Sequence, residues 1–136
     1  MIYQKEIVLP AYPRGFHLIG RHIREALEEL PEQGLIHLYK QHTSAALAIN
    51  EGADPNVRSD LEQIFNRLVP ENHPYYTHVD EGPDDMPSHA KAIMTGASLN
   101  IPVSGRKLAL GTWQEIYLCE FRNNGGRRKV LATIIS

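Results

Sequence analysis

The sequence predicts an α+β fold: one compact domain over residues 1–136, with antiparallel β-sheets in a sandwich-like or barrel-like arrangement and about three helices. The length is that of a single domain, and a chain of this size buries roughly two-thirds of its unfolded surface. The predicted strands gather near the C-terminus instead of alternating with helices, which favours antiparallel pairing over parallel βαβ units.

The first half of the chain begins with a predicted strand over residues 2–9. A helix follows, because apolar residues recur at helical spacing until Pro31 and Gly34 end it. These apolar residues are Phe16, Ile19, Ile23, Leu27 and Leu30. The stretch "LIHLYKQH" over residues 35–42 predicts a strand that continues after His42 into "SAALAIN".

Two further helices are predicted in the middle of the chain. Asp54 is a suitable N-cap residue, and Pro55 suits the first helical position. The helix after them is expected to bury a stripe formed by Val57, Leu61, Ile64, Phe65 and Leu68. After a loop, Asp85 is expected to cap a third helix, with Pro87 in its first turn and Gly96 at its end.

The last third of the chain is predicted to be β-structure. Strands are expected over residues 101–103, 106–111 and 113–122. The sequence "NNGG" at residues 123–126 predicts a hairpin turn into a closing strand over residues 128–136.

The predicted strand 113–122 mixes apolar and polar residues on both of its faces. One face carries Trp113, Glu115, Tyr117, Cys119 and Phe121, and the other carries Gln114, Ile116, Leu118, Glu120 and Arg122. A polar cavity or a subunit interface would explain this mixture, as would chance in a short strand. Glu120 and Arg122 share a face, so we expect them to pair. Trp113 and Gln114 could contact a heterocycle, although a lone tryptophan more commonly fills a core.

Composition excludes several classes of protein. The net charge of -2 and the scattered basic residues argue against nucleic-acid binding. The single cysteine, Cys119, allows no intramolecular disulfide and no Cys-x-x-Cys zinc site. No apolar run is long enough to span a membrane, and the N-terminus lacks the layout of a signal peptide. We therefore expect a cytoplasmic protein.

The stretch "HVDEGPDDMPSHAKAIMTG" is the first candidate site. It places Asp80, Glu81, Asp84 and Asp85 between His78 and His89. Carboxylates this close repel one another unless a positive group joins them. A simple structural alternative is that the acids cap the helix and His89 lies on its surface. The acids outnumber what one cap needs, so we expect Asp84 and its neighbours to join the two histidines around a cation.

The stretch "QHTSAALAINEGADP" is the second candidate site. Thr43 and Ser44 offer hydroxyl and backbone N–H groups that could hold a phosphate, and Asn50 and Glu51 precede a predicted helix N-terminus. The alternative is an ordinary strand followed by a polar turn. Zinc accepts three histidines plus water, or two histidines and a carboxylate. We therefore expect a divalent ion, zinc, magnesium or manganese, held by His42, His78, His89 and Asp84.

Several blocks of the sequence together resemble the YjbQ family, also named secondary thiamine-phosphate synthase. They are "HTSAALAINEGADPNVRSDL", "DDMPSHAKAIMTG", "IPVSGRKLALGTWQEIYLCEF" and the closing strand with its Arg-x-Val pattern. The resemblance implies a compact antiparallel α+β fold, assembly as a homotrimer and a polar cleft near a subunit boundary. It also implies site residues at His42, Asn50, Glu51, His78, Asp85, His89 and Gln114.

The reaction that this resemblance implies joins a pyrimidine diphosphate to a thiazole phosphate and releases pyrophosphate. On that basis we expect His89, His42, Asp85 and Glu51 to be catalytic. We expect Thr43, Ser44, Asn50, Gln114 and Arg122 to bind the phosphorylated substrate. Two alternatives remain: a metal-dependent hydrolase of a phosphorylated or amide substrate, and a trimer that binds a metabolite without reaction.

Overall fold

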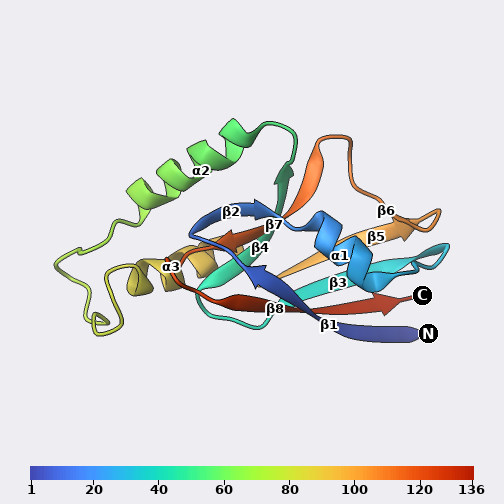
Figure 1. Ribbon diagram of the computed structural model, residues 1–136, viewed down its shortest axis with the longest axis horizontal. Helices are drawn as coiled ribbons and strands as arrows, with labels where there is room; N and C mark the ends of the chain where they lie inside the picture. The colour runs from blue at the N-terminus through green and yellow to red at the C-terminus, as the bar shows by residue number, and fades with distance from the viewer.

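The computed structural model describes all residues, 1–136, and has eight strands and three helices (Figure 1). The strands are β1 (Ile2–Ala11), β2 (Gly15–Leu18), β3 (Gln33–Lys40), β4 (Ala45–Glu51), β5 (Ser98–Ser104), β6 (Lys107–Leu108), β7 (Gln114–Glu120) and β8 (Arg127–Ile135). The helices are α1 (Gly20–Leu27), α2 (Pro55–Leu68) and α3 (Asp85–Thr95). No helix is long and apolar enough to cross a membrane.

The strands form two antiparallel sheets, as the sequence predicts. One sheet has five strands in the order β1-β8-β3-β5-β6, and the other has three in the order β2-β7-β4. Every strand pair in both sheets is antiparallel. The α+β class and the single compact domain are therefore confirmed.

The two sheets and the helices stack in layers around two apolar cores. The larger core lies between the sheets, where Ile36 and Leu38 of β3 meet Ile116 and Leu118 of β7. The smaller core lies on the other side of the three-stranded sheet and contains Phe16, Ala46, Ala92, Tyr117, Cys119 and Phe121. Helix α2 packs on this side against β2, and α3 packs against β4.

The position of β7 between the two cores explains its mixed pattern. Ile116 and Leu118 face one core while Tyr117 and Cys119 face the other, so this strand is buried on both sides. Burial raises the pKa of the Cys119 thiol to about 12, which keeps it protonated and unreactive. The strand needs neither a polar cavity nor a subunit interface to account for its apolar residues.

The first helix begins later than predicted, at Gly20 and not near Phe16. Residues Gly15–Leu18 are strand β2, which pairs with β7, and α1 covers only Gly20–Leu27. The apolar spacing is correct within the helix, because Ile23 and Leu27 are buried. Phe16 belongs to the other core, and its coincidence with helical spacing caused the error.

The stripe predicted on α2 is not buried. No residue of α2 is fully buried, and Ile64 and Leu68 are exposed by 51% and 62%. Leu61 and Phe65 are partly buried against the smaller core. The predicted start of this helix is confirmed, because the Asp54 side chain accepts a hydrogen bond from the Asn56 N–H group.

Helix α3 ends before Gly96 as predicted, but Asp85 does not cap it. Asp85 is the first helical residue, and Asp84 occupies the cap position without a side-chain capping hydrogen bond. The carboxylates of both residues are instead engaged with groups from other parts of the chain.

Residues 123–126 are not a hairpin turn, because β7 and β8 lie in different sheets. The segment carries the chain from one sheet to the other, beside a buried ion pair between Glu120 of β7 and Arg128 of β8. The Arg128 Nη2 atom lies 2.6 Å from Glu120 Oε2, and its Nε atom lies 2.7 Å from Oε1. A side chain at Gly125 would collide with both partners, which explains a glycine there. The expected pairing of the Glu120 and Arg122 side chains is wrong.

Arg128→Met is expected to destabilise the fold by about 3–5 kcal/mol, because it leaves the Glu120 carboxylate buried without a partner. The double variant Glu120→Met/Arg128→Met is expected to recover most of that loss. Urea denaturation of the two variants measures both effects. Lys129→Met, on the exposed face of the same strand, is the matched control and should change stability by less than about 0.5 kcal/mol.

Candidate functional site

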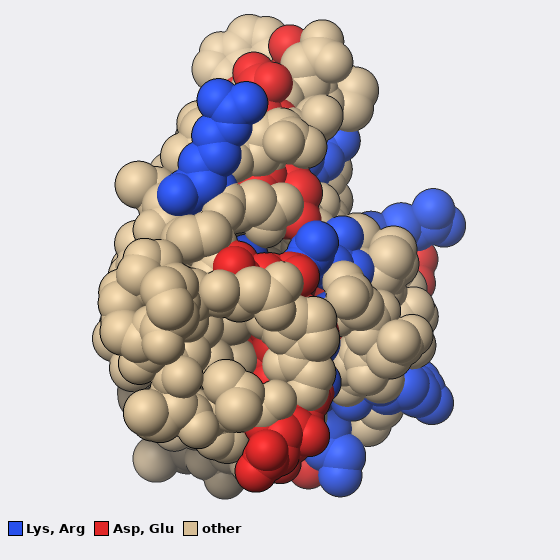
Figure 2. All heavy atoms as spheres, turned by 90° about the vertical axis from the view of Figure 1, so that its left-hand side faces the viewer, with Lys and Arg blue, Asp and Glu red and all other residues tan.

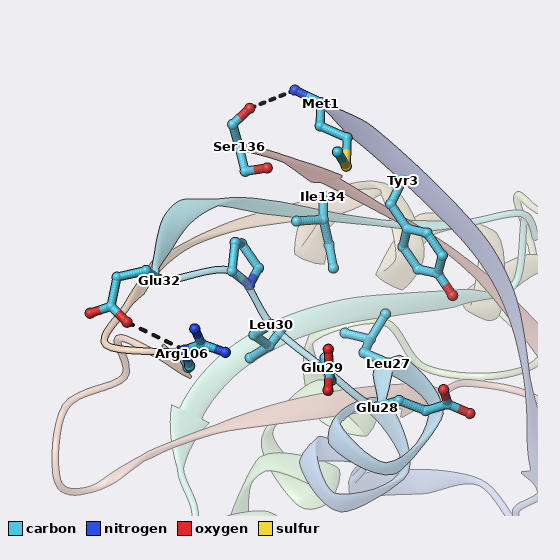
Figure 3. Close-up of a pocket in the computed structure, with 11 residues that line it drawn as sticks. Met1, Tyr3, Leu27, Glu28, Glu29, Leu30, Glu32, Arg106, Ile134 and Ser136 are labelled. Atoms are coloured by element: carbon cyan, nitrogen blue, oxygen red, sulfur yellow. Dashed lines mark hydrogen bonds and ion pairs between the residues drawn. The ribbon is translucent and has the colours of Figure 1, made fainter.

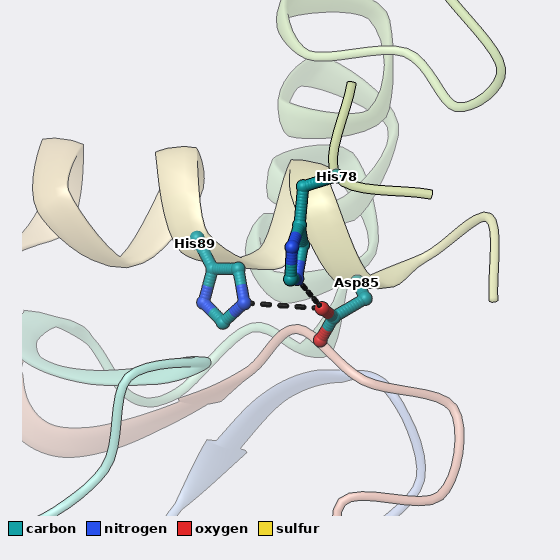
Figure 4. Close-up of side chains that lie close together, drawn as sticks. All are labelled: His78, Asp85 and His89. Atoms are coloured by element: carbon teal, nitrogen blue, oxygen red, sulfur yellow. Dashed lines mark hydrogen bonds and ion pairs between the residues drawn. The ribbon is translucent and has the colours of Figure 1, made fainter. Parts of the chain in front are cut away.

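Two histidines converge on one buried carboxylate at the start of α3 (Figure 4). Asp85 and His89 are four residues apart on this helix, so their side chains share a face. His78 reaches them from the loop between α2 and α3. The Nε2 atom of His78 lies 2.6 Å from Asp85 Oδ2, and the Nε2 atom of His89 lies 3.1 Å from the same oxygen. Asp85 is only 1% exposed.

The orientation of His89 is fixed by its second ring nitrogen. His89 Nδ1 lies 2.9 Å from the backbone carbonyl oxygen of Thr43. A carbonyl only accepts, so Nδ1 carries a proton, and Nε2 is the ring nitrogen that would offer its lone pair to a metal. A backbone carbonyl that fixes the tautomer in this way is a common feature of metal-binding histidines.

Arg122 holds the two aspartates at the start of α3. Its Nε atom donates to Asp84 Oδ2 at 2.8 Å, its Nη1 atom to Asp85 Oδ1 at 2.5 Å, and its Nη2 atom to the Glu81 carbonyl at 3.0 Å. The Asn123 N–H group also donates to Asp84 Oδ2 at 2.9 Å. Asp84 and Asp85 are therefore both held ionised, and each has one of its oxygens bound to this guanidinium.

The pKa of both aspartates is depressed. Burial opposes ionisation of Asp85, but hydrogen bonding to His78 and the positive charge of Arg122 outweigh it and lower its pKa. Burial also opposes ionisation of Asp84, and the hydrogen bonds from Asn123 and Arg122 lower its pKa. The site thus keeps two carboxylates charged at neutral pH.

The three residues His78, Asp85 and His89 fit a divalent metal ion. One ligand atom from each lies within 4.8 Å of the other two. Tetrahedral zinc holds its ligand atoms about 3.3 Å apart, so the 3.1 Å between His89 and Asp85 suits it. The 2.6 Å between His78 and Asp85 would have to lengthen by less than about 1 Å. Asp85 Oδ1 remains bound to Arg122 and leaves Oδ2 for the cation.

His42 and Asp84 were also expected to be ligands, but they lie outside this group. His42 Nε2 accepts a hydrogen bond of 2.7 Å from the Lys129 N–H group. Burial, followed by the nearby charge of Arg128, lowers the pKa of His42, so the ring is neutral. His42 does line a depression of about 330 Å³ together with His89, Lys40 and Thr43.

A second depression of about 410 Å³ borders the cluster at His78. His78, His73 and Tyr76 contribute to its lining, together with uncharged loop residues. The His73 Nδ1 atom is buried there and has no hydrogen-bond partner. The His78–Asp85–His89 cluster is therefore bordered by one depression on the His78 side and another on the His89 side.

Three predicted site residues lie far from this cluster. Asn50, Glu51 and Gln114 are at the end of the three-stranded sheet where Glu51 pairs with Gln114. The other end, where Ala45 pairs with Glu120, leads to the cluster. Six residues separate the two ends, which is about 20 Å along a strand. The Glu51 carboxylate accepts from the Asp54 N–H group and serves the turn before α2.

The remaining predicted substrate-binding residues have local roles. Ser44 is buried, and its hydroxyl accepts from Arg128 Nη2 at 2.9 Å. Thr43 is exposed beside the depression, with its carbonyl bound to His89. Arg122 is committed to the aspartates, so few of its donors remain for a substrate. Trp113 is 67% exposed and fills no core.

Sequence reasoning missed the charged partners of this region. Lys40 and Arg128 are both buried near His42. The sequence pattern indicates that Arg128 is buried, because it shares the two-residue spacing of Val130, Ala132 and Ile134, the inward-facing residues of β8. The same spacing indicates that Lys40 is buried, because it continues the inward-facing positions Ile36 and Leu38 of β3.

The largest depression, of about 590 Å³, lies elsewhere (Figure 3). It is formed where both chain termini meet the end of α1, and the Met1 ammonium donates to the Ser136 carbonyl at its edge. Its charged side chains are Glu28, Glu29, Glu32 and Arg106, and it contains no histidine or cysteine. The smaller depressions beside the histidine cluster are therefore better candidates for a functional site than this larger one, because histidines line them.

The surface near the loop before α3 has a mixed charge pattern. Figure 2 views this end of the molecule, and acidic side chains run down the middle of the face with lysine and arginine side chains beside them. This face therefore carries charges of both signs, and below the surface Arg122 pairs with Asp84 and Asp85.

The fold and this cluster define a small antiparallel α+β protein with a candidate metal centre. A family model described as UPF0047 protein YjbQ-like matches residues 5–136, and the chain belongs to this family. It is 52% identical to UPF0047 protein YjbQ of Salmonella typhimurium and 49% identical to that of Escherichia coli O157:H7, over 98% of each chain.

Solved structures of the family share the fold. A conserved hypothetical protein from Thermus thermophilus matches with a TM-score of 0.83 and 33% identity, over 94% of this chain and 97% of that one. A conserved protein of the YjbQ/UPF0047 family from Clostridium acetobutylicum matches with a TM-score of 0.84 and 33% identity, over 96% and 99%.

Arg122→Met is expected to lower the free energy of unfolding by about 1–3 kcal/mol at neutral pH, because it leaves two buried carboxylates without their cation. Both aspartates have a lower pKa in the folded chain, so the stabilisation by Arg122 is complete above about pH 4 and is lost as the pH falls through the folded pKa values. Urea denaturation of the wild-type chain and of Arg122→Met, at neutral pH and in acid, measures the difference in their free energies of unfolding.

The control for this comparison is Arg106→Met, which removes an exposed arginine from the opposite end of the fold. Its effect should be within about 0.5 kcal/mol at both pH values. A loss of stability in Arg122→Met that persists undiminished in acid would contradict the assigned role of the ion pairs.

Proposed function

We propose that the chain is a divalent-metal-dependent enzyme that acts on a phosphorylated small molecule. The observation that supports this is the convergence of His78 Nε2 and His89 Nε2 on one oxygen of the buried Asp85. Two histidines and a carboxylate are a common catalytic ligand set for zinc, and they leave a coordination position for water or substrate. A metal bound there supplies positive charge to a phosphoryl oxygen or a leaving diphosphate.

The residues of the chain prepare the site for that ion. The Thr43 carbonyl holds the proton of His89 at Nδ1 and keeps Nε2 available. Arg122 holds Asp85 ionised and orients its second oxygen toward the histidines. The buried position of Asp85 limits access of water, which strengthens electrostatic interactions at the cluster. His42 remains neutral beside the depression, with its Nδ1 atom as a hydrogen-bond donor.

Within this class, we propose the synthesis of thiamine phosphate as the first reaction to test. The resemblance to the YjbQ family suggests it, and the two depressions bordering the cluster fit a reaction with two substrates. The rings of His73 and Tyr76 line one depression and suit contact with a heterocycle. Metal-dependent hydrolysis of a phosphate ester is the second candidate, because the same ligand set leaves a position for water.

Elemental analysis of the purified, untagged chain tests the metal ligands. The wild-type chain is expected to hold about one equivalent of a divalent metal, and His89→Ala and His78→Ala are each expected to lose it. His42→Ala is the matched control and should retain the metal, because His42 lies outside the ligand group. Retention of the metal in both His78→Ala and His89→Ala would refute the assignment.

Turnover separates the reactions. The chain is incubated with the pyrimidine diphosphate and the thiazole phosphate, and in parallel with a panel of phosphate esters, with and without a chelator. Thiamine phosphate formed only without the chelator supports the transferase, whereas chelator-sensitive release of phosphate supports the hydrolase. Ligand binding without any turnover would leave the metabolite-binding alternative and contradict an enzymatic role.

We also propose that the protein assembles as a homotrimer, as the family resemblance suggests. The outer face of the five-stranded sheet carries an apolar row across four strands, formed by Ile2, Ile135, Leu35 and Pro102 in register. Ile2 is 69% exposed and Ile135 is 49% exposed. Contiguous apolar surface of this kind is typical of a protein–protein interface.

Light scattering after size-exclusion chromatography is expected to give a mass about three times 15.4 kDa. Ile135→Lys places a charge in the middle of the apolar row and should shift the protein to monomers. Val79→Lys changes an exposed apolar residue on the α2–α3 loop and should leave the mass unchanged. A monomeric wild-type chain would refute the assembly.

A further inference from the structure

Lys40 is a buried lysine without a counter-ion. The residue is only 9% exposed, at the end of β3 where the chain leaves the five-stranded sheet. Its ammonium donates one hydrogen bond, to the His42 carbonyl oxygen at 2.6 Å, and makes no salt bridge. The nearest charge that acts on it is the positive Arg128, and Arg128 is itself neutralised by Glu120. A buried ammonium in these surroundings is destabilising unless an anion joins it.

The residues around Lys40 include hydrogen-bond donors and no carboxylate. Lys40 lines the depression of about 330 Å³ together with His42, Thr43 and His89. The other lining residues are Ala92, Ile93, Gly96 and Ala97, so no carboxylate faces this space. The Lys40 ammonium, the Nδ1–H group of neutral His42 and the Thr43 hydroxyl are donors that suit an anion, whereas both ring nitrogens of His89 are already engaged. The nearby carboxylates of the candidate metal cluster are those of Asp85, which contacts His89, and Glu81, which lies near His78. Neither residue lines this depression.

We propose that this depression is a phosphate-binding subsite in which the Lys40 ammonium is the principal contact. The ammonium has three donors and uses one, which leaves two for phosphate oxygens. A phosphate is preferred to a carboxylate because it offers more oxygens and more negative charge to a pocket that contains several donors.

This subsite deepens the proposed function, on which its catalytic meaning rests. His89 belongs both to the depression and to the candidate metal cluster. A phosphate bound to Lys40 therefore lies next to the residue that would also hold the metal. Burial and the charge of Arg128 lower the pKa of Lys40, and an anion beside its ammonium would oppose both effects and favour the charged form. The binding of phosphate can be measured whether or not the metal is present.

Isothermal titration calorimetry tests the proposal with two probes, inorganic pyrophosphate and methyl phosphate. The full-length chain is titrated as purified and again after removal of metal with a chelator. Lys40→Met, which keeps the length of the side chain and removes the charge, is expected to weaken binding by about tenfold or more. Tighter binding of pyrophosphate indicates a diphosphate ligand, and tighter binding of methyl phosphate indicates a monoester.

Lys107→Met is the matched control. Lys107 is an exposed lysine that pairs with Ser104 at the far end of β5, whereas the depression lies before the start of that strand. The affinity of the Lys107→Met variant for both phosphate probes should stay within about twofold of the wild-type value. Thermal denaturation gives a second measurement: pyrophosphate should raise the melting temperature of the wild-type chain and not that of Lys40→Met. The variant itself should fold, because it loses only an unpaired buried charge.

Equal affinity of Lys40→Met and the wild-type chain, in both metal states, would overturn the subsite. Absence of binding to the wild-type chain, or an equal loss in Lys107→Met, would also overturn it. Failure of the metal assignment has a different signature, which is a metal-free wild-type chain that still binds phosphate through Lys40.

Discussion

The buried ion pair between Glu120 and Arg128 joins the two sheets at the end of the sandwich where the candidate site lies. Three segments that contact the site leave a sheet next to this pair, namely the residues around Ser44, Arg122 and Lys129. Arg128 binds Ser44, and the residue before Ser44 fixes His89 through its carbonyl. Arg122 follows Glu120 by two residues, and its backbone N–H donates to that same carboxylate. The backbone of Lys129, next to Arg128, binds His42. One desolvated charge pair thus holds the segments that position His42, His89 and Arg122, the arginine that binds both aspartates.

The acidic start of α3 is stable because its charges are neutralised from outside the helix. A helix N-terminus favours carboxylates, but two buried aspartates in succession exceed what the terminal N–H groups can compensate. Arg122 supplies the missing charge by binding one oxygen of each. This leaves Asp85 Oδ2 as the oxygen on which the histidines converge. The carboxylates expected to gather around a cation therefore have a resident cation already, and Asp85 Oδ2 is the one oxygen that faces the histidines.

Much of the fold could be predicted from local patterns. Ile23 and Leu27 reveal the buried side of α1, and the clustering of strands near the C-terminus predicts antiparallel sheets. Errors arose where pairing across the chain overrides local spacing: Phe16 fits a helical period but lies in a strand that pairs with β7. The proximity of Asp85 and His89 follows from helical spacing, whereas the contact of Arg122 with Asp85 joins residues 37 positions apart. The separation of Gln114 from the histidines likewise depends on the strand register, which composition and spacing do not reveal.

The two sides of His89 have opposite electrostatic character, and this asymmetry follows from the architecture. On one side the α2–α3 loop and the start of α3 bring carboxylates, which suit a cation. On the other side the end of the five-stranded sheet brings Lys40 and the charges around Arg128, which suit an anion. A metal ion and a phosphate would each be destabilised in the position of the other, since like charges in a partly buried site repel strongly. If both proposed ligands bind, a cation would lie on the carboxylate side of His89 and a phosphate on the Lys40 side, so that a phosphorylated substrate would be oriented relative to the metal by the charges of the site itself.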